Sequence, residues 1–99
     1  MSEYPRYLLA EIKSPKDEHL EYIGDITVVV LFGLECDNGD VLYLEIRYVD
    51  FENGVVDGDH VTGTLDEAYQ SAFEHYGFLK DDWRNLSKDQ IERIDRSIK

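Results

Sequence analysis

The 99-residue sequence is poor in cysteine, proline, basic residues and long apolar runs. With one cysteine it cannot form an internal disulfide, and nothing suggests an oxidising compartment. The longest apolar stretch, residues 28–34, falls far short of the ~20 residues that a membrane helix requires. No N-terminal apolar run follows a basic segment, which argues against a secretory signal. We therefore expect a cytoplasmic protein with no membrane span.

The scarcity of bases is the most informative of these deficits. Ten Lys and Arg residues accompany 22 Asp and Glu residues, so the formal net charge is −12. Nucleic-acid binding depends on Lys and Arg displacing counterions from phosphates, so a DNA or RNA partner is not expected. Most of the excess lies in residues 21–60, where a single base, Arg47, is present. The acids there are Glu21, Asp25, Glu35, Asp37, Asp40, Glu45, Asp50, Glu52, Asp57 and Asp59. A region in which negative charge predominates in this way attracts a cationic partner.

The chain has the size and apolar content of one domain spanning residues 1–99. Stretches rich in β-branched and aromatic residues predict strands at about 6–13, 26–36 and 41–51. A short fourth strand is expected at 55–62, although an Asp-Gly-Asp sequence interrupts it.

The register of the central hairpin follows from its turn chemistry. A three-residue loop, Asp37-Asn38-Gly39, gives each face of the hairpin a consistent character, whereas a two-residue turn at Asn38-Gly39 mixes apolar and charged residues on both faces. One face then becomes wholly apolar. Its pairs are Leu34 with Leu42, Phe32 with Leu44, Val30 with Ile46 and Val28 with Tyr48.

The second face of the same hairpin is amphipathic. Its pairs are Glu35 with Val41, Gly33 with Tyr43, Leu31 with Glu45 and Val29 with Arg47. An apolar centre edged with charge is typical of an interface, so we expect the helices to leave this face uncovered.

Two helices follow the strands. Apolar residues at helical spacing predict the first at about 65–76, with Thr64 and Glu67 as a capping box. A second capping box, Ser87 with Gln90, introduces the second helix at about 88–98. The predicted fold is α+β: an antiparallel meander of three or four strands with both helices packed on one face.

The sequence contains no catalytic or cofactor-binding motif. Asp57, Asp59 and His60 lie within four residues and are the nearest approach to a metal or general-base cluster. None of the glycines in the acidic turns has the spacing of a calcium loop. We therefore predict a protein that is not an enzyme and has neither a metal nor another cofactor.

The favoured hypothesis is a small interaction module that binds a basic protein through its sheet, as an inhibitor or immunity protein does. The predicted contact residues are Val29, Leu31, Glu35, Tyr43, Glu45, Arg47, Asp50, Glu52, Asp57 and Asp59. A homodimer through the second sheet face is an additional prediction.

One alternative is a homodimeric domain with a small-ligand or metal pocket between the helices and the sheet. Tyr69, Tyr76, Trp83 and His75 would line that pocket. Another is a catalyst built on Asp57, Asp59 and His60.

Overall fold

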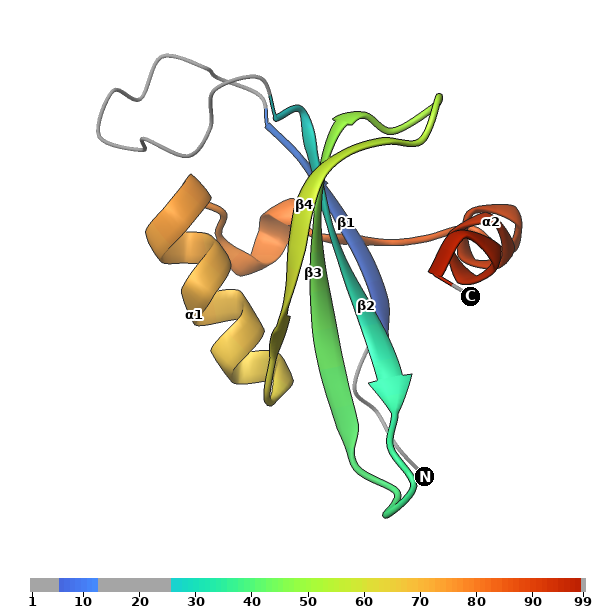
Figure 1. Cartoon of the computed structure of the whole chain (residues 1–99). Coiled ribbons are helices and arrows are strands. Elements are labelled where there is room, and N and C mark those ends of the chain that lie inside the picture. The colour runs from blue at the N-terminus through green and yellow to red at the C-terminus, as the bar shows by residue number, and fades with distance from the viewer. Residues whose placement is uncertain (1–5, 13–25, 99) are drawn as a thin grey trace.

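A computed structural model describes residues 6–12 and 26–98 of the chain, and it confirms the α+β class (Figure 1). The strands form one antiparallel sheet in the order β4-β3-β2-β1-β5. The elements are β1 (Tyr7–Glu11), β2 (Val28–Glu35), β3 (Val41–Asp50), β4 (Val55–Thr62), α1 (Leu65–Tyr76), the short 3-10 helix η1 (Lys80–Asp82), β5 (Arg84–Asn85) and α2 (Lys88–Ile98).

The β2–β3 hairpin has the predicted register. All eight pairs from Val28–Tyr48 to Glu35–Val41 occur as the three-residue loop requires. The loop is closed by a hydrogen bond from the Cys36 amide to the Asp40 carbonyl at 2.7 Å. Gly39 has φ of 92°, a left-handed conformation that favours glycine, so the turn chemistry does fix the register.

The two helices lie on opposite faces of the sheet, which corrects the prediction that both pack on one face (Figure 1). Ile94 of α2 packs with the wholly apolar face, whose buried members include Val30 and Ile46. Ala68 and Ala72 of α1 pack with the second face, against Leu31 and Val29 respectively. The second face is therefore covered within the monomer.

The position of α1 follows from its sequence. A connection of two residues joins it to β4, Thr64 and Glu67 form the predicted capping box, and the left-handed Gly77 ends it. Small residues on its inner stripe, such as Ala68 and Ala72, allow close approach to the sheet, and both are completely buried. The apolar centre of the second face gives this helix a surface on which to pack.

A fifth strand, absent from the prediction, carries the chain between the two faces. β5 pairs with β1 through Leu8–Asn85 and Leu9–Arg84. The Leu86 amide also donates to the Tyr7 carbonyl at 3.1 Å. This edge contact carries the chain from the side of α1 to that of α2 (Figure 1).

β4 spans the predicted range despite its Asp-Gly-Asp sequence, which forms a β-bulge. Gly58 pairs with Arg47 and Val56 pairs with Tyr48, so Asp57 is the extra residue. A Cβ atom at position 58 would collide with the Arg47 guanidinium, so glycine makes room for that side chain across the strand. Among the strands of residues 6–12 and 26–98, β4 pairs with β3 alone and is therefore an edge of the sheet.

Candidate interaction surface

Four of the ten predicted contact residues are inside the protein. Val29, Leu31 and Glu45 have no exposed surface, and Tyr43 is 4% exposed. All four lie on the face that α1 covers, because alternate residues of β2 and β3 point to the same side of the sheet. In this structure α1 therefore stands between these four side chains and any partner or second copy of the chain.

Glu45 is the centre of a buried polar network. Its Oε2 accepts a hydrogen bond of 2.9 Å from the Tyr76 hydroxyl, and its Oε1 lies 3.4 Å from the Ser71 hydroxyl, which can donate to it. The Nε2 atom of His60 lies 3.7 Å from the same Oε1. Burial, followed by the nearby Glu45 carboxylate, raises the pKa of Tyr76 above its ordinary value of 10.0. These contacts tie β3, β4 and α1 together under the helix.

Arg47 is mostly buried by its own strand pair. Its Nε lies 3.6 Å from the Asp57 Oδ2 and makes no hydrogen bond to a described residue. With 24% of its side chain exposed, it partly neutralises Asp57, which is 52% exposed. Arg47 is thus a structural partner of the bulge rather than an open contact residue.

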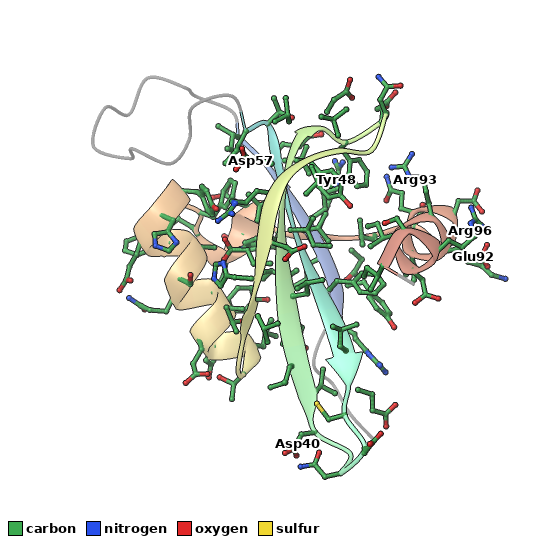
Figure 2. The ribbon with its side chains drawn as sticks, in the orientation of Figure 1. Asp40, Tyr48, Asp57, Glu92, Arg93 and Arg96 are labelled. Carbon is green, nitrogen blue, oxygen red and sulfur yellow. The ribbon has the colours of Figure 1, made fainter. Side chains whose placement is uncertain are left out.

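The remaining predicted acids lie toward the surface but not in one cluster. Glu35 stands near the β2–β3 turn, 3.9 Å from Arg6. Asp50 lies at the β3–β4 turn, where hydrogen bonds from the Asn53 side chain and backbone lower its pKa. Glu52 is exposed in that turn. Asp40 and Asp57 mark opposite ends of the sheet in Figure 2.

β4 is where exposed acids and exposed apolar residues coincide. Val55, Val56 and Val61 are 48%, 44% and 57% exposed, and Asp57 and Asp59 lie between them. The strand contains no Lys or Arg. These five residues define the β4 edge.

The proposed catalytic cluster does not converge. His60 pairs with Glu45 and faces α1, whereas Asp59 pairs with Ile46 and faces the opposite side of the sheet. Within residues 6–12 and 26–98, no group of three or more His, Cys, Asp or Glu side chains could hold a metal ion.

A groove lies on the outer side of α1, beside the segment that contains η1. Its volume is about 480 Å³. We call it the aromatic groove and define it by Asp66, Tyr69, Phe73, Phe78, Lys80 and Trp83.

Two of the residues predicted for a pocket, Tyr69 and Trp83, do line this groove. The other two do not. Tyr76 donates to Glu45, and His75 lies beside Ser71, 3.4 Å from its hydroxyl. Because the helices cover opposite faces, the groove is formed by α1 and η1 rather than by both helices and the sheet.

Sequence reasoning missed Phe73, Phe78 and Lys80 as groove residues. Phe73 is 50% exposed although it lies on the apolar stripe of α1, and Phe78 is 6% exposed beneath Trp83. The position of Phe73 at the margin of the apolar stripe was the sequence feature that could have indicated an exposed ring. Whether that ring is exposed, however, depends on how residues 77–83 fold beside α1.

Comparison with protein-family models, curated proteins and solved structures gives no match. In the described part of the chain, no helix has the length and apolar character needed to cross a membrane.

Proposed function

We propose that the protein is a small acidic binding module that accepts a basic, extended segment of another protein along the β4 edge. Its mode of action would be that of an inhibitor or immunity protein, which occupies a basic surface of its target. The observation that carries the proposal is the edge position of an acid-bearing strand with exposed valines.

The backbone supports this mode of binding. An edge strand has one row of N–H and C=O groups that its own sheet does not use, and an extended segment can pair with them. Residues Gly58–Thr62 pair in unbroken register with Arg47–Tyr43. The bulge at Asp57 marks the end of this regular region, so a pairing segment would have about five residues of straight strand to follow.

The side chains favour a basic partner over an apolar or acidic one. Asp59 is exposed and has no salt bridge among the described residues. In a paired strand, directly opposed charges of opposite sign are stabilising and like charges are destabilising. Val61 supplies apolar contact area next to that charge.

The same rule disfavours pairing of β4 with a second copy of itself. An antiparallel register centred on Gly58 places Asp57 of each copy opposite Asp59 of the other. Registers centred on Asp57 or Asp59 place that residue opposite its own copy. These three arrangements bring carboxylates together and are disfavoured, whereas Lys or Arg opposite the same positions is favoured.

The test uses a blocked peptide of alternating Lys and Val, with a Glu and Val peptide of equal length as its control. The Lys peptide is expected to shift the amide resonances of β4 and to slow hydrogen exchange at alternate β4 residues. Raising the salt concentration from about 0.05 M to about 0.5 M is expected to weaken this binding, because exposed charges are screened.

The decisive variant is Asp59→Asn, because Asp59 lies in the straight part of β4 and makes no salt bridge among the described residues. One opposed charge pair contributes about 0.2–1 kcal/mol, so affinity is expected to fall about 1.4-fold to fivefold. The matched control, Asp89→Asn, makes the same charge change on α2. Equal losses in both variants, or resonance shifts away from β4, would contradict the proposal.

A further inference from the structure

The aromatic groove combines a large aromatic surface with one carboxylate. Trp83 is in ring contact with Tyr69 at a centroid distance of 6.2 Å and with Phe78 at 5.2 Å. The ring planes are inclined by 47° and 66°, so these rings present faces in different directions rather than forming one flat stack. Half of the Phe73 side chain is open to solvent at the same groove.

The protein already places a cation on this surface. The Lys80 Nζ atom lies 5.6 Å from the centre of the Tyr69 ring. An ammonium group at this distance is attracted by the negative face of the ring. The ring of Tyr69 therefore already binds a cation of its own chain.

Asp66 adds a formal negative charge beside this ring. It precedes Tyr69 by three residues on α1, so the two side chains share a helix face. Burial and then the charge of Asp66 raise the pKa of the Tyr69 hydroxyl. Asp66 makes no salt bridge with any residue that the structure describes.

An occupant that satisfies both features must have an apolar stem and a cationic head. A purely apolar ligand would remove the Asp66 carboxylate from water without giving it a partner, which is unfavourable. An anion would be repelled by the same carboxylate, and it would find a partner only in Lys80, which is already placed on the Tyr69 ring. Lysine and arginine side chains have the required form, since their methylene stems cover apolar surface while the charged end stays polar.

We propose that the aromatic groove binds the cationic side chain of a lysine- or arginine-containing protein segment, which displaces Lys80 from the Tyr69 ring and faces Asp66. The stem of the bound side chain lies along Phe73. This site is formed by α1 and residues 78–83, so it does not depend on binding at the β4 edge and is tested separately from it.

Trp83 provides a direct readout because it is the only tryptophan in the chain. The probes are three blocked peptides of one sequence that carry lysine, trimethyllysine or norleucine at the central position. The two charged peptides are expected to change the Trp83 emission saturably. The norleucine peptide, which keeps an apolar stem without the charge, is expected to bind about threefold to thirtyfold more weakly.

Lys80→Gln gives the sharpest test because it removes the internal competitor. Binding of the charged peptides is expected to strengthen, whereas binding of the norleucine peptide is expected to stay the same. Lys88→Gln is the matched control, since it removes one base from the start of α2, outside the groove. A similar gain in both variants would reduce the effect to net charge and overturn the assignment.

Tyr69→Leu tests the ring itself while retaining apolar bulk. It is expected to weaken the charged peptides selectively, with circular dichroism reporting whether the fold is preserved. If this variant unfolds, the Lys80→Gln comparison alone decides the matter. Equal binding of norleucine and lysine, or weaker lysine binding in Lys80→Gln, refutes the site. If choline binds as tightly as the peptides, the ligand is a small free organic cation. If the protein self-associates in a Tyr69-dependent way, the occupant is a second copy of the chain. Either result overturns the assignment to a partner segment.

Discussion

Replacing Tyr76 by phenylalanine removes one oxygen from the buried network and leaves the aromatic ring in place. That oxygen donates the 2.9 Å hydrogen bond to the Glu45 Oε2 atom. Glu45 is completely buried, so water cannot replace the lost donor without a local opening of the structure. Packing is conserved because phenylalanine keeps the ring contact with Phe78. The substitution therefore isolates the cost of an unsatisfied buried acceptor.

The expected cost is about 1–3 kcal/mol in the free energy of unfolding, the usual penalty for leaving a buried polar group unpaired. For a domain of this size, each kcal/mol lowers the melting temperature by about 4–8 °C. Urea denaturation followed by circular dichroism measures the free energy, and an unchanged dependence on urea would show that the compactness of both states is conserved.

A double-mutant cycle separates the hydrogen bond from other effects of the substitution. Glu45→Leu replaces the carboxyl group with an apolar side chain. In that variant the Tyr76 hydroxyl no longer has a carboxylate to donate to, so Tyr76→Phe removes no hydrogen bond to position 45. It is expected to be close to neutral there, giving a coupling energy of about 1–3 kcal/mol. A cost below about 0.5 kcal/mol in the original background, or equal costs in both, would refute the network as the source of stability.

Three further predictions concern stability. The pKa of Tyr76 is raised in the folded state, so this tyrosine does not change the free energy of unfolding below about pH 10. Above that pH its ionisation in the unfolded chain lowers the free energy of unfolding by up to about 1.4 kcal/mol per pH unit. Tyr76→Phe should flatten that decline in urea titrations at alkaline pH. Gly33→Ala places a Cβ 2.6 Å from the Arg6 Cγ and 3.0 Å from its carbonyl oxygen, and should cost about 1–3 kcal/mol by thermal melting. Thr64→Ala removes the hydroxyl that caps α1 and should cost about 1 kcal/mol by thermal melting, whereas Thr64→Ser, which keeps a capping hydroxyl, serves as the control and should cost far less.

Local chemistry was sufficient to predict much of the fold. The bounds of α1 and α2 and the register of the β2–β3 hairpin depend on capping residues, a left-handed glycine and alternation, all of which are short-range features of the sequence. The hairpin prediction also identified which residues share a face. Leu31 and Glu45 do lie opposite each other.

These short-range features do not predict how the two helices are distributed over the two faces of the sheet. That distribution depends on β5, two residues long and without an apolar pattern of its own, which pairs with β1 and redirects the chain. The amphipathic second face gave a misleading signal, because Glu45 on it suggested exposure. Its burial requires donors from α1 and β4, and no local pattern indicates that Tyr76 and Ser71 reach the same carboxyl group.

Burial of the second face changes how a charged partner can be recognised. A flat apolar centre with an acidic rim would supply both steering and contact area in one place. With that centre covered by α1, the two contributions are separated. Exposed acids occur along β4 and in the turns at both ends of β3, and exposed aromatic surface lies at the aromatic groove. Exposed charges act mainly on association, whereas desolvated anchors act mainly on dissociation. Substitutions of Asp57 and Asp59 should therefore alter the association rate and its dependence on salt, while Tyr69→Leu should alter the dissociation rate of any segment seated in the groove.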